Sequence, residues 1–407
     1  MLPLTFFLNL GQFCTMSVII RYVLRELGVA FLLGFVALTL LLLIVGVVQQ
    51  AIDNHVPLIY VPHLIPPVFA NMSPISLPVT LLLAVTVFFS RMSGNNEVTA
   101  LKALGIPPKV FLIPVFVLAF FFSILGVGIN ELAITYGRQG INMVLYYGAE
   151  DILIERLKQT HQVATKNNLI TIIVKGVDGQ GRLLSPTIML KKESVTIEAS
   201  AAQIETDFNE NKFKVTFDDI QVVGEGAFRF AGGRRTVEIP LSELFPIRRE
   251  NHPSDMGLYQ ISTERKITAE QMEEQRRIIA AHRTFGASMG SVDAWATPLI
   301  EDAKKKIRRL QSHQNKLSVE PPRRWAQGFC CFFFVWLGAP LAIWMRKSDF
   351  FASFFACFVP ILILYYPLLA FGLDQAKNGS LPPMCVWTAN VVIGLIGLWF
   401  LRQIHRY

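Results

Sequence analysis

The sequence predicts an α-helical membrane protein with about six transmembrane helices in two groups of three and an extracytoplasmic, jelly-roll-like all-β domain inserted between them. Composition, six long apolar runs and a strand-rich middle segment lead to this fold class. The chain has 407 residues, of which 52% are hydrophobic and 17% are charged. Soluble domains average about 25% charged residues. This excess of apolar residues therefore indicates a chain that is solvated by a bilayer.

The net charge of +8 fits the same class. Many Arg and Lys residues flank the apolar runs, where they can anchor helix ends at lipid headgroups. This placement favours a membrane over a nucleic acid as the partner of the basic residues.

The apolar runs are long enough to span a bilayer, which takes about 20 residues. Six qualify: 27–48, 59–90, 110–130, 325–345, 350–373 and 383–401. Prolines crowd the outer half of the second run and predict a kinked or broken helix there. A broken helix can line a transport path, whereas a kink can be absorbed by packing, and the sequence allows both.

The first 15 residues are interpreted as an extension or a misassigned start, because Met16 begins a stretch that looks like a natural start. The first three spans then belong to residues 16–130 and the last three to residues 323–407. Basic residues lie before the first run, between the second and third, between the fourth and fifth, and after the sixth. Since short cytoplasmic loops carry Lys and Arg, both termini are expected in the cytoplasm and residues 131–322 outside it.

Residues 131–250 contain the predicted β-domain. Short segments rich in β-branched residues alternate with turn sequences such as DGQG at 178–181 and NENK at 209–212. This pattern is typical of antiparallel strands in a sandwich or jelly roll.

Two of these strands place alternate apolar side chains on one face. Such faces form either a dry core or an apolar slot, because the period of two is the same in both. The alternating side chains are Ile170, Ile172 and Val174 on one strand and Val215 and Phe217 on the other.

Residues 251–322 predict two charged helices, within ITAEQMEEQRRIIAAHR and PLIEDAKKKIRRLQSHQNKL. A solvated helical hairpin is the default interpretation of such charge runs. An arm that docks a partner is the alternative.

The loop between the second and third runs predicts a helix over residues 96–104. Asn95 or Asn96 can cap its start, Glu97 favours the positive end of its dipole, and Gly105 can end it in a left-handed conformation. The three apolar residues Val98, Leu101 and Leu104 are expected on one face. That face can dock into a soluble partner or lie in the headgroups, and spacing alone favours the headgroups.

Several kinds of chemistry have no signature in the chain. There is no GxxxxGK[ST] phosphate-binding loop, no catalytic set in the strand-rich segment and no motif for a cofactor or metal. No ionisable residue lies near the middle of a run, which argues against an ion-coupled carrier. If the protein transports something, the energy must come from a separate subunit.

Five segments carry a resemblance to a known family. They are IIRYVLREL at 19–27, the proline-rich second run, NNEVTALKALGI at 95–106, RRWAQGFCCFFFVWLGAPLAI at 323–343 and GSLPPMCVWTANVVIGLIGLWFLR at 379–402. In this order, and with a β-domain between two groups of three spans, they resemble the permease family of the lipopolysaccharide-export ABC transporter (LptF/LptG). The opening IIRY is slightly closer to the LptF side.

The resemblance implies a permease of the bacterial inner membrane that pairs with a second related permease over a dimer of cytoplasmic ABC ATPases. It implies a periplasmic jelly roll that passes lipopolysaccharide or a similar glycolipid to bridge proteins of similar fold. The first and fifth spans would form lateral gates. The helix at 96–104 would dock on the ATPase, with Glu97 at the family's acidic contact position, so docking becomes the favoured interpretation.

The resemblance also favours the apolar slot in the β-domain as the lipid path. Two features depart from the family. The outer part of the first run, VGVVQQAID, has no basic residue to meet lipid phosphates, so Arg138 or the partner permease would have to supply that contact. Residues 251–322 are also longer than the family requires.

The sequence is therefore interpreted as a transport subunit without an enzymatic site or cofactor. A membrane-anchored envelope scaffold is the rival interpretation. An ion-coupled carrier is a weaker one because the spans are uncharged.

Overall fold

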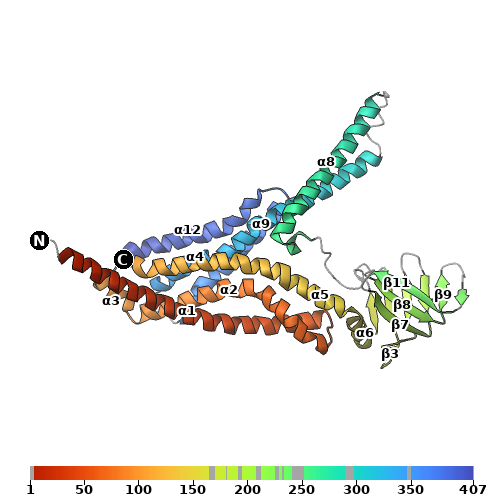
Figure 1. Cartoon of the computed structure of the whole chain (residues 1–407), viewed down its shortest axis with the longest axis horizontal. Helices are drawn as coiled ribbons and strands as arrows, with labels where there is room; N and C mark the ends of the chain where they lie inside the picture. The colour runs from red at the N-terminus through yellow and green to blue at the C-terminus, as the bar shows by residue number, and fades with distance from the viewer. Residues whose placement is uncertain are drawn as a thin grey trace. The chain divides into compact units, whose positions relative to one another are not determined.

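The structure is a computed structural model (Figure 1). It describes residues 4–164, 170–179, 181–190, 195–207, 212–224, 229–231, 233–240, 252–288, 298–345 and 350–406. The chain divides into a helical unit and an inserted unit. The helical unit comprises Met1–Leu42, Ala70–Thr135 and Pro253–Tyr407, and the inserted unit comprises Leu43–Phe69 and Tyr136–His252.

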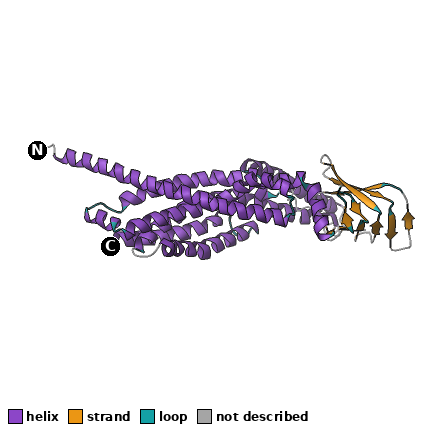
Figure 2. Cartoon of the chain, turned by 90° about the horizontal axis from the view of Figure 1, so that it is seen from below, coloured by secondary structure: helices purple, strands orange, loops and turns teal. Residues whose placement is uncertain are grey.

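The helical segments before the strands are α1 (Leu4–Asp53), η1 (Leu58–Tyr60), α2 (Val61–Gly94), α3 (Glu97–Ala103), α4 (Lys109–Leu132), the π-helical η2 (Ala133–Arg138), α5 (Gln139–Tyr147) and α6 (Ala149–Thr160). Those after the strands are η3 (Pro253–Asp255), α8 (Leu258–Ser288), α9 (Pro298–Trp344), α10 (Phe350–Pro360), the π-helical η5 (Ile361–Tyr365), α11 (Tyr366–Lys377), η6 (Pro383–Trp387) and α12 (Thr388–Arg406). Figure 2 shows that the strands are confined to the inserted segment.

Six helical segments among the described residues are long and apolar enough to cross a bilayer. They are Val18–Asp53, Leu58–Gly94, Lys109–Tyr147, Ile300–Trp344, Ala352–Lys377 and Pro383–Ile404. Three precede the strands and three follow them, which confirms the predicted fold class.

Two helices differ from the sequence-based expectation. The helix α2 is continuous from Val61 to Gly94, so the predicted broken helix is wrong. Its prolines are accommodated within one helix, and the interruption falls earlier, at the turn that contains Pro57. The helix α9 continues from a charged half into the fourth span, with Pro321 and Pro322 in its interior. The sequence suggested two elements here because polarity changes at this point, yet the backbone stays helical.

The core of the helical unit consists of two apolar clusters. The first joins α2, α4 and α9 and includes Phe89, Phe111 and Val335. The second joins α9 to α10, η5, α11 and α12 and includes Phe334 and Tyr365. These clusters make α9 the central helix of the unit, since it contributes to both.

Glycines let α4 and α9 approach closely. A Cβ atom added at Gly126 would lie 3.3 Å from the carbonyl oxygen of Gly328. Small residues of this kind are the usual contact in pairs of membrane helices, because they allow the backbones to pack.

The charged half of α9 pairs with α8 as a helical hairpin that projects from the bundle (Figure 1). Apolar and small side chains from both helices are buried along it, including Thr268, Met272, Ile300 and Ala303. The predicted hairpin is therefore present in the described residues of this stretch.

The strands of the inserted unit form two antiparallel sheets. The strands are β1 (Gln162–Ala164), β2 (Ile170–Ile173), β3 (Gly176–Val177), β4 (Leu183–Leu184), β5 (Thr187–Leu190), β6 (Val195–Glu198), β7 (Ala201–Asp207), β8 (Lys212–Asp218), β9 (Gln221–Gly224), β10 (Arg229–Ala231) and β11 (Arg235–Pro240). One sheet has the order β1-β2-β5-β6-β9-β10 and the other β11-β8-β7-β4-β3.

Helices α5 and α6 belong to the inserted unit and pack against the segment around η1. The Tyr60 hydroxyl donates a hydrogen bond of 2.6 Å to Asp151. A Cβ at Gly140 would lie only 2.8 Å from Cβ of Pro67. The start of the second span is thus held to helices α5 and α6.

Candidate functional site

The helix α3 is shorter than predicted, with seven residues. Its N-cap is Asn96, in the left-handed conformation with φ of 61° and without a side-chain capping bond. Asn96 thus occupies the expected N-cap position, but its side chain makes no capping bond, because that bond needs an extended backbone at the cap residue.

The predicted left-handed end at Gly105 is confirmed, with φ of +80°. The Gly105 amide donates to the Lys102 carbonyl at 2.9 Å and the Ile106 amide to the Leu101 carbonyl at 3.0 Å. These two bonds form a Schellman motif, which satisfies carbonyls that the helix end leaves free.

The apolar residues of α3 differ in burial. Val98 is buried, and Leu101 packs beside it against the first apolar cluster. Leu104, the C-cap residue, is 76% exposed. Of the three residues expected on one apolar face, Val98 and Leu101 are therefore covered and Leu104 is not.

The arrangement leaves a free surface on α3. Val98 and Leu101 hold the helix to its own bundle, and the Lys102 ammonium donates a hydrogen bond of 3.4 Å to the Ile404 carbonyl in α12. The exposed residues are Thr99, Ala100, Ala103, Leu104 and Gly105, with Glu97 half-buried at the start. The helix is thus anchored on one side and open on the other.

The proposed lipid-path residues are placed in the two sheets. Ile172 in β2 and Val215 and Phe217 in β8 are at most 1% exposed, and Val174, just after β2, is 3% exposed. In this structure they form a covered core, and a lipid could reach them only if the sheets part. The side chain of Ile170 lies outside the described residues. Arg138, half-buried, is the last residue of η2.

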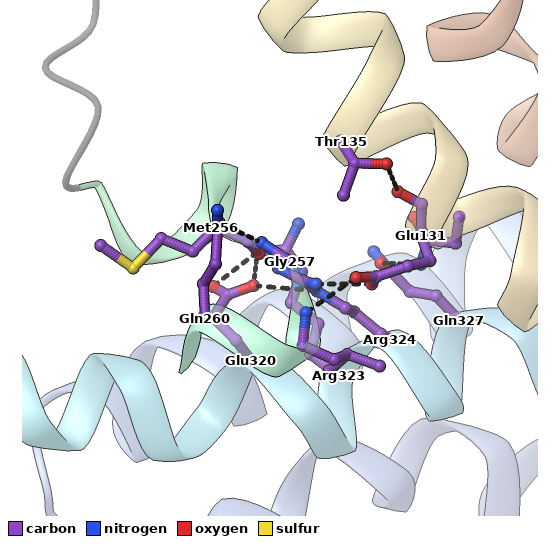
Figure 3. A network of polar contacts seen from close by, with 11 residues as sticks. Glu131, Thr135, Met256, Gly257, Gln260, Glu320, Arg323, Arg324 and Gln327 are labelled. Carbon is purple, nitrogen blue, oxygen red and sulfur yellow. Dashed lines mark hydrogen bonds and ion pairs between the residues drawn. The ribbon is translucent and has the colours of Figure 1, made fainter. Parts of the chain in front are cut away.

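A buried charge network, which sequence reasoning did not identify, lies where α4, α9 and η3 meet (Figure 3). The Arg324 guanidinium donates to Glu131 Oε2 at 2.7 Å and to the Met256 carbonyl at 2.5 Å. Glu320 accepts from Arg323 at 2.9 Å and its Oε2 lies 4.0 Å from Arg324 Nε. Arg324 is 0% and Glu320 1% exposed.

Glu131 serves a second partner as well. Its Oε1 accepts a hydrogen bond of 2.7 Å from the Leu258 amide, the first amide of α8. Arg324 and Glu320 are buried, whereas the Glu131 side chain is 29% exposed, and buried charges persist only when paired and hydrogen-bonded. The weak sequence signal was the pair Arg323–Arg324 one turn after Glu320; a glutamate four residues before an arginine faces it on a helix.

The described residues hold no group of three or more metal-ligating side chains. The architecture defines the class: a polytopic membrane protein with a β-rich insert. The comparison with protein families then identifies the chain as a member of the lipopolysaccharide export system permease LptF/LptG family, which matches residues 21–403. The match covers nearly the whole chain and confirms the resemblance drawn from the sequence. Among curated proteins, none matches the chain.

Proposed function

We propose that this chain is one permease subunit of an ATP-driven exporter that extracts lipopolysaccharide or a similar glycolipid from the inner membrane. Family membership makes it a multi-pass inner-membrane permease for lipopolysaccharide export and not an enzyme. The proposal adds the energy source, the partner subunits and the direction of transfer. ATP hydrolysis takes place on a separate cytoplasmic ATPase dimer, and a second related permease completes the cavity.

The observation that carries the energy coupling is the open side of α3. Its apolar anchors Val98 and Leu101 fix the helix to the bundle, so a force applied at the exposed Leu104 would be passed to the first apolar cluster. Glu97 supplies a carboxylate at the same end. In this proposal α3 and both termini lie in the cytoplasm, and residues 131–322 lie in the periplasm.

Exposed apolar surfaces fit lateral entry of a lipid. The helix α1 exposes large apolar side chains along its length, among them Leu32, Leu33 and Val36. The fifth span does the same with Phe355 and Leu362. A membrane helix exposes such residues to acyl chains or to a neighbouring helix. Both helices therefore suit the gate role that the family resemblance gives to spans one and five.

The periplasmic end of the path is proposed to run through the β-region toward jelly-roll bridge proteins. Lipid transfer would require the two sheets to part, so that Ile172 and Phe217, now buried, meet acyl chains. Arg138 is proposed to meet lipid phosphate.

The partner and ligand are tested by isolating the chain through a tag and identifying bound protein and lipid by mass spectrometry. We expect an ABC ATPase, a second permease and a phosphorylated glycolipid. Envelope proteins without an ATPase or glycolipid would favour a scaffold instead.

The coupling helix is tested with Glu97→Lys. Breaking a partly buried ion pair can cost about 3–5 kcal/mol and an exposed pair much less, so ATPase recovery and export should fall while membrane insertion stays normal. Glu270→Lys makes the same charge change at an exposed position of α8 and serves as the control. Equal export by both variants would favour α3 as a headgroup helix.

A further inference from the structure

The chain passes between the helical unit and the inserted unit at residues 42–43, 69–70, 135–136 and 252–253. The last two of these crossings, an outgoing and a returning connection, lie close in sequence to the charge network. The outgoing connection leaves through the last turn of α4 and continues into η2. The returning one enters at η3 and passes through Met256 and Gly257 into α8. Within the helical unit, both connections are bonded to one buried arginine, Arg324 (Figure 3).

Each bond of this arrangement uses a different atom. One terminal nitrogen of Arg324 donates to Glu131 on the outgoing side, and the other donates to the Met256 carbonyl on the returning side. Glu131 closes the loop, because its second oxygen accepts from the Leu258 amide. The planar fork of a guanidinium suits two such partners at once, which a lysine ammonium does not match.

The returning segment is buried and tightly packed. Pro253, Ser254, Asp255 and Met256 are buried, and Met256 packs with Ile261 and Leu317 in an apolar cluster of its own. A Cβ at Gly257 would lie 3.3 Å from both Glu131 Oε1 and Thr135 Cγ2. The segment is therefore held by packing as well as by hydrogen bonds.

We propose that Arg324 and Glu131 are positioning residues for transport, which fix the outgoing connection at 135–136 and the returning connection at 252–253 to the α4–α9 pair. This inference rests on the proposed function. Because α4 and α9 pack closely through Gly126 and Gly328, they move together, and the Arg324 clamp makes both connections follow that movement. Neither residue contacts the lipid; their role is to keep α4, α9 and the returning segment together during transport.

The clamp is tested with the double variant Glu131→Gln/Arg324→Met. It removes both charges together, which is tolerated far better than leaving one charge buried and unpaired. Glu320 keeps its partner, since Arg323 bonds it at 2.9 Å. Arg324→Lys keeps the charge but not the fork. Arg276→Gln breaks the exposed Arg276–Glu273 pair on α8 and is the matched control.

Two readouts are compared in the complex isolated with the chain. The first is amide hydrogen exchange of residues 254–262, which should quicken by about tenfold or more in the double variant, as for a segment that opens locally. The second is glycolipid released per ATP hydrolysed. It should fall roughly fivefold or more, with ATPase rate and assembly retained, as for a lost conformational step. Arg324→Lys should lie between the double variant and the wild type, and Arg276→Gln should match the wild type.

If amide exchange of residues 254–262 in the double variant is as slow as in the wild type, the clamp is wrong. The clamp is also wrong if the double variant releases as much glycolipid per ATP as the wild type. If the wild-type complex itself releases no lipid on ATP addition, the proposed function fails, whereas the exchange comparison still decides whether the clamp holds the returning segment. If the single variant Arg324→Met does not accumulate while the double variant does, the unpaired Glu131 charge explains it and the clamp stands.

Discussion

Gly328 is the tightest point of the α4–α9 contact, and Gly328→Val tests whether that contact holds the bundle together. A Cβ at Gly328 would lie 2.3 Å from Val127 Cγ2, 2.7 Å from Val127 N and 2.9 Å from Val127 Cα. The side-chain methyl can rotate away, but the backbone atoms cannot. For the added Cβ to lie at a normal distance of about 3.5 Å from Val127 N, the two helices must move apart by roughly 0.8 Å.

The loss of unfolding free energy in Gly328→Val follows from overpacking. Forcing extra carbons into a filled contact typically costs about 1–3 kcal/mol, sometimes more, and three carbons against backbone indicate the upper end, about 3 kcal/mol. Replacing Gly by Val in a helix returns only a few tenths of a kcal/mol in propensity. The net loss is therefore about 3 kcal/mol. For 407 residues the unfolding entropy is about 0.85 kcal/mol/K, so this loss lowers the melting temperature by roughly 3–4 °C.

The assay is thermal unfolding in detergent, followed with a dye that fluoresces on reaction with newly exposed thiols. Cys330, Cys331 and Cys357 are buried and report on the core. Gly128→Val is the control, since Gly128 lies in α4 with nothing within 4 Å of its added Cβ; a shift of less than about 0.5 kcal/mol is expected for such a site. Equal melting of the two variants would refute the role of close backbone packing at Gly328.

Three further predictions concern α3, topology and the β-region. Gly105→Val places a branched side chain at φ of +80°, which costs about 1–2 kcal/mol, so less ATPase should be recovered with this variant. Gly94→Ala, whose added Cβ meets open space, is the control, and equal recovery of the ATPase with both variants contradicts the coupling role. A cysteine at the exposed Asp178 should be labelled in intact cells by a reagent that cannot cross the inner membrane; labelling only after permeabilisation reverses the topology. Photo-crosslinkers at Ile172 and Phe217 should capture glycolipid only during ATP hydrolysis; crosslinks to neighbouring strands alone would show a permanently closed core.

The spans could be predicted from sequence because bilayer solvation imposes a local requirement, a run of apolar residues long enough to cross. The ends of the helices were harder to predict from the sequence. The backbone of α9 continues past the change from charged to apolar residues, and Pro321 and Pro322 do not end it. The left-handed end at Gly105 was predictable, since glycine adopts that conformation without strain. Asn96 adopts the same conformation, which asparagine tolerates better than most residues, but its place before a helix favoured a side-chain cap.

The strand faces were predictable for the same local reason, as Ile172, Val215 and Phe217 alternate with more exposed neighbours and are all buried. The clamp was not predictable. Arg324 and Glu131 are 193 positions apart, and each lies beside an apolar run, where a charged residue ordinarily anchors a helix at the headgroups. Only the packing of α4 against α9 brings them together and excludes water from the arginine.

The most direct test of the central claim is glycolipid release from proteoliposomes that contain the complex isolated with the chain. Labelled lipopolysaccharide is placed in the bilayer, and its transfer to a soluble periplasmic acceptor is followed after ATP is added. We expect transfer with ATP, none with a non-hydrolysable analogue, and a marked loss with Glu97→Lys but not with Glu270→Lys. Transfer at the same rate without ATP, or ATP hydrolysis without any transfer in the wild type, would contradict it.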